Sequence, residues 1–491
     1  MHIVIAGNGI IGLTTAFRLA VRASKGDKIS IVGKTAREGS ATLAAAAMLN
    51  SFAEIEVDSL DSELGRYRFE LSHLATGMWP RFIADIIQAA GSRLPSGCAA
   101  SLRPCGGCFD TGTYVVNNTA ADQLDDENFD AIVAALNMFD EPHQHVSPRD
   151  IPNYKPEQRH RATRAVYIPN EGWMNPRLTV TALEAALANF PQVHLVNDNV
   201  ERFVKEGAKL HAVLLESGAR IEADRFLLAT GATATDLLQK SNLGIDVQKI
   251  FYGVGVSIEL MSIDNPHNRC VRTPNRGLAC GVYSVPYFVS PDVPHNHIVI
   301  GASNHILSAP SFFPRLTAVE SLTRAAIEQI NAGFFCAQLI RVNLGWRPTS
   351  QDTHPVIGTT SIPNLVIATG TKRDGFHLSP LLSQYISAML RGEPVDDRFS
   401  VFAPERPLIR DYTREAAIAK AVKHQMSVAY QHGFSPSKSR MPEELAEAYR
   451  ADLERLHDRV GAWDWGIPPE MIEVYRKGQA GVDEPRKAVV A

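Results

Sequence analysis

A glycine motif between a strand and a helix constrains the fold of this chain most strongly. Gly7, Gly9 and Gly12 follow the apolar segment 3–5 in the spacing G-x-G-x-x-G, and residues 13–22 then carry apolar side chains at helical spacing. These glycines permit a tight turn, let the backbone approach a pyrophosphate and allow the helix to pack against the strand. The pattern predicts the βαβ opening of a parallel sheet, with an anionic dinucleotide at the helix N-terminus.

The second apolar strand, 28–32, ends without the acidic residue that usually binds a ribose in such sites. Gly33 and Lys34 stand at that position, and Glu38 lies past the expected end of the strand. We therefore expect backbone groups or Lys34 to hold the ribose, or the ribose to be held less tightly. A lysine there also suits a phosphorylated ribose, and a merely solvated side chain is the alternative.

Later segments extend this pattern. Segments 226–231 and 365–370 predict buried parallel strands, and both end in Ala-Thr-Gly. Segment 249–301 alternates apolar residues with turns, which favours an antiparallel sheet. Apolar stripes predict helices over 413–430 and 443–460. We therefore predict an α/β fold with a Rossmann-like domain, a mixed antiparallel-sheet substrate domain and a helical C-terminal extension.

Composition excludes several classes of protein. The 491 residues suit two or three domains, and 45% of them are apolar while 21% are charged, as in ordinary globular chains. Lys and Arg number 49 against 53 Asp and Glu, a formal net charge of −4, which excludes a strongly basic nucleic-acid binder. No apolar run approaches the ~18 residues of a membrane span. The first residues form a strand without a basic leader, so we expect a cytoplasmic protein that binds no membrane.

Cysteine and histidine spacing predicts neither a metal site nor a disulfide framework. Six cysteines are too few for a disulfide scaffold. Cys105 and Cys108 form an isolated C-x-x-C, without further soft ligands at zinc-finger spacing and without a following helix. We expect a structural pair there. The histidines in 143–145 and 295–297 lack a third ligand, and we expect them to be solvated.

Four segments of the sequence carry a further signal: the glycine turn at 3–12, the Ala-rich turn at 44–49, the Gly-Trp-Arg-Pro-Thr segment at 345–358, and the segment at 368–380. Together they resemble the D-amino-acid oxidase (DAO) family of FAD-dependent oxidoreductases, and within it the glycine oxidases most. The last two are much more specific than the glycine motif. The resemblance covers about residues 1–391.

This resemblance implies a bound FAD. A cysteine attaches the flavin covalently in related sarcosine oxidases, whereas Gly345 stands near that position here, so we expect non-covalent FAD. The predicted cofactor-binding residues come from six places in the sequence. These are the glycine turn, the position that usually binds the ribose, the Ala-rich turn, a contact to the adenine, the end of a strand, and the segment that runs along the flavin ring. They are Gly7, Gly9, Ile10, Ile11, Gly12, Gly33, Lys34, Thr42, Ala46, Ala47, Met48, Val200, Gly231, Thr371, Lys372, Arg373, Asp374, Gly375, Phe376 and His377.

Arg347 and Arg373 are the predicted substrate-binding residues. A planar guanidinium can hold a carboxylate through two hydrogen bonds, and the matching arginines of glycine oxidase hold the substrate carboxylate and line the site. Tyr283 matches a family tyrosine that hydrogen-bonds the substrate. The alternatives are surface ion pairs for the arginines and a core position for the tyrosine. We expect Asp352 and His354 to orient Arg347.

The resemblance implies oxidation of the CH–NH bond of an amino acid or related amine. The imine would hydrolyse, and O2 would be reduced to H2O2. His377 replaces an aliphatic residue of the family, and Tyr287-Phe288 replaces a basic one, which puts glycine itself in doubt as the substrate. His377 could tune the flavin, contact the substrate or simply pack. A hydroxy-acid dehydrogenase that passes electrons to a quinone or carrier, and a non-catalytic FAD-binding subunit, are the competing hypotheses.

The predicted oxidoreductase core spans residues 1–400. Its FAD-binding parts are about 1–50, 150–240 and 340–395, and its substrate domain is about 51–149 and 245–339. In one hypothesis, the helical extension at 401–491 packs on the core or forms a dimer face. The sequence therefore allows either a monomer or a homo-oligomer. In the other hypothesis, the extension caps the site with Trp463 or Trp465 facing the substrate.

Overall fold

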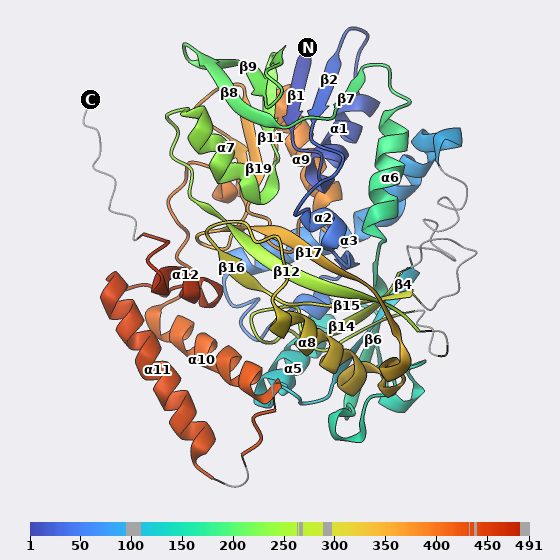
Figure 1. Ribbon diagram of the computed structural model, residues 1–491, viewed down its shortest axis with the longest axis vertical. Helices are drawn as coiled ribbons and strands as arrows, with labels where there is room; N and C mark the ends of the chain where they lie inside the picture. Colours follow the sequence, from blue (N-terminus) through green and yellow to red (C-terminus); the bar gives the residue numbers. More distant parts are fainter. Residues whose placement is uncertain are drawn as a thin grey trace.

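Six strands form the sheet that the glycine motif predicts. The computed structural model describes residues 1–94, 110–262, 264, 269–287, 297–431, 433–436 and 439–481. The strand order is β18-β19-β11-β1-β2-β7, parallel throughout except for the antiparallel edge strand β18 (Figure 1). The bounds are β1 His2–Ala6, β2 Lys28–Val32, β7 Val193–Val196, β11 Arg225–Leu228, β18 Val356–Thr359 and β19 Leu365–Thr369. The predicted βαβ opening and both later parallel strands are confirmed.

Helices cover one face of this sheet. They are α1 Ile10–Val21, α3 Glu63–Ala90, α6 Pro176–Leu187 and α9 Ser379–Arg391, which pack on one another and enclose the largest apolar core. The other face carries α7 Ala234–Ser241 and the antiparallel meander of β8 Val200–Glu206, β9 Lys209–Leu215 and β10 Arg220–Glu222.

A second, mixed sheet lies beyond the ends of the parallel strands (Figure 1). Its longest strands, β12 Ile250–Met261 and β17 Gln338–Ser350, pair antiparallel, while β13 pairs in parallel with β4. The other strands are β3 Met48–Leu49, β4 Asp110–Asn117, β5 Gln144–Val146, β6 Arg164–Trp173, β13 Cys270–Arg272, β14 Tyr283–Pro286, β15 His297–Gly301 and β16 His305–Leu307. The antiparallel pairing predicted for segment 249–301 is present between β12 and β15 and between β14 and β15. The helices α2 Ala41–Ala44, α5 Gln123–Met138 and α8 Leu316–Ala325 accompany it.

The predicted C-terminal helices are present. They are α10 Arg414–Gln431, α11 Met441–Val460 and α12 Ile472–Arg476, with the short 3-10 helix η9 Pro469–Met471. Their apolar side chains form one buried cluster with Phe251 of β12 and Ile306 of β16. Figure 1 shows these red helices beside α5 and β16. The division of the chain at residue 400 stays a prediction.

His377 anchors the loop before α9 to α3. Its Nε2 lies 2.7 Å from Thr76 Oγ1, and Trp79 Nε1 donates to its carbonyl oxygen at 2.8 Å. Burial lowers the pKa of His377 to about 4, so the ring is neutral at neutral pH. Of the roles considered for this residue, these contacts match packing.

Acid should weaken the native state through this histidine. An unfolded chain binds the proton near pH 6.5 and the folded chain only near pH 4, so stability is complete above about 6.5 and falls towards 4, by up to about 3 kcal/mol. His377→Gln removes the titration and should make the decline between these pH values shallower. Urea unfolding of both proteins at about pH 7 and pH 4.5 measures this; an equal decline in both would contradict it.

Candidate active site

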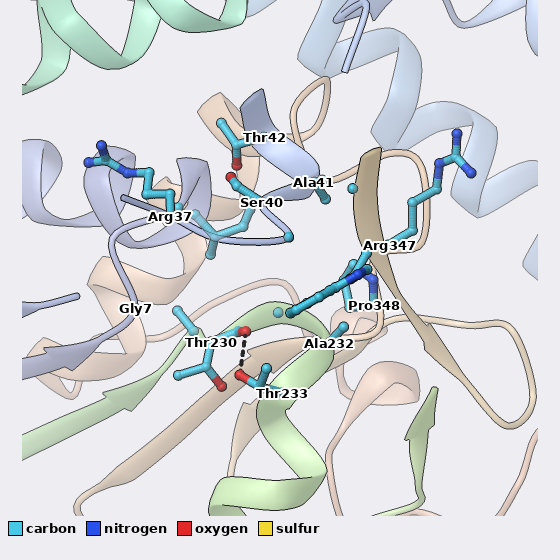
Figure 2. A pocket seen from close by; sticks show the side chains of 18 of the residues that line it. Gly7, Arg37, Ser40, Ala41, Thr42, Thr230, Ala232, Thr233, Arg347 and Pro348 are labelled. Atoms are coloured by element: carbon cyan, nitrogen blue, oxygen red, sulfur yellow. Dashed lines mark hydrogen bonds between the residues drawn. The ribbon is translucent and has the colours of Figure 1, made fainter. Parts of the chain in front are cut away.

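A cavity of about 550 Å³ lies where the parallel strands end and the mixed sheet begins. It collects the turns that follow β1, β2, β11 and β19, which is where open α/β sheets place ligands. Figure 2 shows Arg37 and Arg347 on opposite sides of this pocket, with Thr42 and Thr230 between them. The lining comes from residues near 7–11, 32–45, 199–201, 229–240, 255–257, 345–348 and 368–376, together with Glu216 and Tyr283.

The glycine turn at one end of the pocket is built for backbone contact. Gly7 has φ +117°, and a Cβ on it would lie 2.3 Å from the carbonyl oxygen of Ala229. A Cβ on Gly12 would lie 2.0 Å from the Gly7 oxygen, so Gly12 packs the helix rather than lining the pocket. Helix α1 begins at Ile10, whose N–H donates to Thr42 Oγ1 at 3.1 Å. This turn and helix N-terminus suit an anionic group.

Asn8 occupies the space beside Gly33. Its Nδ2 donates to the carbonyl oxygens of Gly33 at 3.0 Å and Lys34 at 3.1 Å. A Cβ on Gly33 would lie 2.4 Å from the Asn8 side chain, so the Asn8 amide takes the room that a larger residue would need. Lys34 pairs with Glu216 at 2.6 Å, and both line the pocket with Val200. The predicted Lys34 is thus at the pocket, but already paired.

Arg37 lines the same end of the pocket and was not predicted. Its guanidinium is almost fully buried, pairs with Glu184, and donates through Nε to the Asn8 carbonyl oxygen at 3.1 Å. The positive φ of Arg37, 44°, turns the chain there. Nothing in a lone arginine after a strand distinguishes it from a solvated residue, so sequence reasoning had no signal for it.

The Ala-rich turn meets β17 closely. A Cβ on Gly345 would lie 2.7 Å from the Ala44 Cβ, and the pocket is lined by Ala44 and Ala45. Of the predicted residues here, Thr42 lines the pocket, whereas Ala46, Ala47 and Met48 are outside its lining. Met48 Sδ lies 3.7 Å from Cys270 Sγ. No cysteine is among the described residues that line the pocket.

Arg347 extends from β17 into the pocket. Nη1 donates to the Ser303 carbonyl oxygen at 3.0 Å and to Asn304 Oδ1 at 3.3 Å. The guanidinium lies over Gly255, where a Cβ would come within 2.4 Å of it. No carboxylate of the described residues forms an ion pair with Arg347, so its positive charge is available to a ligand.

Arg373 lies at the same pocket but is paired. Its Nε is 3.4 Å from Glu54 Oε2, and its Nη2 is 3.9 Å from Glu56 Oε1. Burial alone would lower the pKa of Arg373, but Cys280, Glu54 and other acidic neighbours hold it well above the ordinary value. The structure thus brings both predicted arginines to one cavity, with different partners.

Tyr283 of β14 completes this end. It is 4% exposed, lines the pocket, and its ring covers Gly301, where a Cβ would lie 2.1 Å from the hydroxyl oxygen. Burial raises the pKa of Tyr283, so the phenol stays protonated and can donate a hydrogen bond. The neighbouring Tyr287 is also buried but does not line the pocket, and its hydroxyl oxygen accepts a hydrogen bond from Arg177 Nε at 3.0 Å.

The remaining predicted residues divide between those that line the pocket and those that do not. Asp374 and His377 lie outside the lining, and Asp374 is 3.9 Å from Arg68. Trp346, which was not singled out, lines the pocket beside Gly39 and donates through Nε1 to the Ser311 carbonyl oxygen at 2.7 Å. The lining also includes Gly7, Gly9, Ile10, Ile11, Gly33, Gly231, Thr371, Lys372, Gly375 and Phe376.

Two expectations are corrected here. Asp352 and His354 do not orient Arg347: Asp352 pairs with Arg406, and His354 Nε2 lies 3.0 Å from Asp411 Oδ2. Both partners, Arg406 and Asp411, belong to the segment after α9, and the spacing of the motif could not reveal them.

Trp463 is 66% exposed, Trp465 lies in the C-terminal apolar cluster, and neither lines the pocket, so neither faces a substrate there.

The described residues contain no group of three or more His, Cys, Asp or Glu side chains that could hold a metal ion. Their helices include none that is long and apolar enough to cross a membrane. Cys98, Cys105, Cys108, Phe288 and His295, on which other expectations rest, lie outside the described residues.

Comparisons with known proteins agree with this geometry. A glycine oxidase of Pseudomonas putida is 27% identical over 415 residues, which cover 82% of this chain and 98% of that protein. The bifunctional protein ThiO/ThiG of Nostoc sp. is 23% identical over 475 residues, but this chain spans only 63% of that relative's length.

Solved structures share the fold. Glycine oxidase of Geobacillus kaustophilus superposes with a TM-score of 0.67 at 20% identity, covering 83% of this chain and 99% of that one. Iminodiacetate oxidase of Chelativorans sp. gives a TM-score of 0.64 at 20% identity, covering 83% and 100%. The profile of the DAO family, described as FAD dependent oxidoreductase, matches residues 2–389. The chain therefore belongs to the DAO family of FAD-dependent oxidoreductases.

Proposed function

We propose that this FAD-dependent oxidoreductase oxidises the CH–N bond of an amino acid or related amine that carries a carboxylate, with O2 as the electron acceptor. One observation carries the proposal: Arg347 presents a guanidinium to the pocket without an acidic partner among the described residues. Arg347 is half-buried, and a guanidinium that faces a cavity in this way is a suitable partner for a carboxylate. Relatives named glycine oxidase and iminodiacetate oxidase support an amino carboxylate as the substrate class.

The pocket fits FAD. The turn at Gly7 leaves no room for a side chain, because a Cβ there would lie 2.3 Å from the Ala229 carbonyl oxygen, and the N-terminus of α1 faces this turn. Arg37 adds a buried cation at this end. We assign the pyrophosphate of FAD to this turn and the adenine end to Gly33, Lys34 and Val200. We assign the flavin ring to Thr42, Ala45 and residues 371–376. Each of these three groups contains residues that line the pocket.

The protein's own residues then have simple tasks. Arg347 binds the substrate carboxylate through two hydrogen bonds, which fixes the position of the neighbouring carbon. Tyr283 donates a hydrogen bond from a phenol that stays protonated. The chemistry that bound FAD would supply is acceptance of a hydride, two electrons and one proton, from that carbon; these electrons, with that proton and one released by the amine nitrogen, would reduce O2 to H2O2, and the imine would hydrolyse in water.

Substrate-dependent bleaching tests this function. The purified protein with its flavin is mixed without O2 with amino acids, N-methyl amines and hydroxy acids, and the loss of flavin absorbance is recorded. We expect bleaching by an amino acid or amine, and H2O2 release in air. Bleaching by hydroxy acids alone, or release of no H2O2 in air, would contradict the proposal, as would a bound flavin that no substrate reduces.

Arg347→Ala should selectively weaken carboxylate substrates. A charge-assisted pair contributes about 1.5–3 kcal/mol, so kcat/KM for the amino acid should fall about 100-fold, whereas the decarboxylated amine should lose little. Arg341→Ala is the matched control, because Arg341 is exposed on the same strand β17. Equal losses for both substrates would show that Arg347 does not bind the carboxylate.

Tyr283→Phe should cost less. It removes one neutral hydrogen bond, worth about 1 kcal/mol, so kcat/KM should fall about fivefold. Because the phenol stays protonated, the wild-type profile of kcat/KM against pH should show no ionisation of Tyr283 up to about pH 10. Steady-state kinetics of both proteins across this pH range measures the two effects, and an unchanged kcat/KM in the variant would leave Tyr283 a packing residue.

A further inference from the structure

A buried ion network joins the C-terminal helices to the loop that carries Arg373. These helices lie outside residues 2–389, which the family profile matches. Lys420 of α10 places its Nζ 2.7 Å from Glu56 Oε2 and 2.8 Å from Asp58 Oδ1. Glu56 in turn lies 3.9 Å from Arg373. One carboxylate therefore connects a lysine of the C-terminal helices to a guanidinium at the pocket.

A second contact reaches the same loop. Glu470 of η9 pairs with Lys372 at 2.6 Å, and only about a seventh of each side chain is exposed, 15% and 14%. The Lys372 N–H donates to the Pro348 carbonyl oxygen at 2.8 Å, which ties this loop to the residue after Arg347. The C-terminal helices thus hold the Arg373 loop at two places.

The charges in this network balance. The cations and the carboxylates are equal in number, and each charge in such a poorly solvated place needs a partner. His424, one turn beyond Lys420, lies 3.9 Å from Glu56, but burial lowers its pKa, so it is neutral there at neutral pH. The cations are Arg272, Lys372, Arg373 and Lys420, and the carboxylates are Glu54, Glu56, Asp58 and Glu470.

We propose that Lys420 is a positioning residue for Arg373. By engaging Glu56, Lys420 prevents this carboxylate from capturing the Arg373 guanidinium, which stays at the pocket as a second cation for the substrate carboxylate. Without Lys420, Glu56 and Asp58 would lose the cation that they share. Glu56 would then attract the Arg373 guanidinium away from the pocket, and its unpaired negative charge would repel an anionic ligand. This inference rests on the proposed function, since it assigns the carboxylate binding of that same site.

Carboxylate affinity tests the inference apart from turnover. Benzoate is titrated into the flavin-loaded protein, and its dissociation constant is read from the change in flavin absorbance. Lys420→Met should weaken benzoate about tenfold, and Glu56→Gln should tighten it a few fold. The double variant should match Glu56→Gln, because Lys420 acts through Glu56. In turnover, Lys420→Met should raise KM more than it lowers kcat.

Lys423→Met is the matched control. Lys423 lies on the same helix, but its side chain is 49% exposed and pairs with Glu127 at 2.7 Å, away from the network. It should bind benzoate as the wild type does. Thermal unfolding of every variant separates a loss of affinity from a loss of fold, and if Lys420→Met fails to fold, Glu56→Gln alone still decides.

Three results would overturn the inference. Lys420→Met could bind benzoate like the control, Glu56→Gln could leave the affinity unchanged, or the effect of Lys420→Met could persist fully in the Glu56→Gln background. A wild type that binds no benzoate would overturn it too. A wild type that binds benzoate but oxidises no amino acid would sink the proposed function and leave this inference standing.

Discussion

Pairing of buried charges is the constraint on which the site depends. Arginine and lysine side chains near the pocket lie beside apolar cores, where an ion without a partner is costly. Arg37 pairs with Glu184, Lys372 with Glu470 and Arg373 with Glu54, while Glu56 lies closer to Lys420 than to Arg373. Arg347 differs, because its described partners are neutral oxygen atoms. The site is thereby left with one clear deficit of negative charge, at the end of the cavity away from Arg37.

The sequence predicted the framework because the framework follows from local rules. Gly7 and Gly12 are demanded by close backbone approach, and the structure shows those approaches directly, whereas a Cβ on Gly9 would meet only the Thr42 hydroxyl, at 3.4 Å. Apolar strands that end in Ala-Thr-Gly were correctly placed in the parallel sheet. Arg347, Arg373 and Tyr283, proposed from separate motifs, lie on one cavity. Their roles remain predictions.

Other features depend on contacts between distant segments, which no local pattern encodes. Asp352 stands near Arg347 in the chain, yet its partner is Arg406, in a segment that returns after α9. Glu54 and Glu56 give no signal as isolated acids, and their role follows only from Arg373 and Lys420, which both come from the C-terminal part of the chain. His377 follows the flavin segment but turns towards α3. Sequence spacing places residues in order, whereas tertiary packing decides where each side chain points.

The close packing of Asn8 on Gly33 bears on how this sequence can change over evolutionary time. An acidic residue introduced at position 33 would place its Cβ 2.4 Å from the Asn8 side chain. A lineage that regained the usual ribose acid would first need a smaller residue at position 8, and would give up the two hydrogen bonds that Asn8 donates. The two positions are therefore expected to vary together among descendants, and the order of substitutions is restricted.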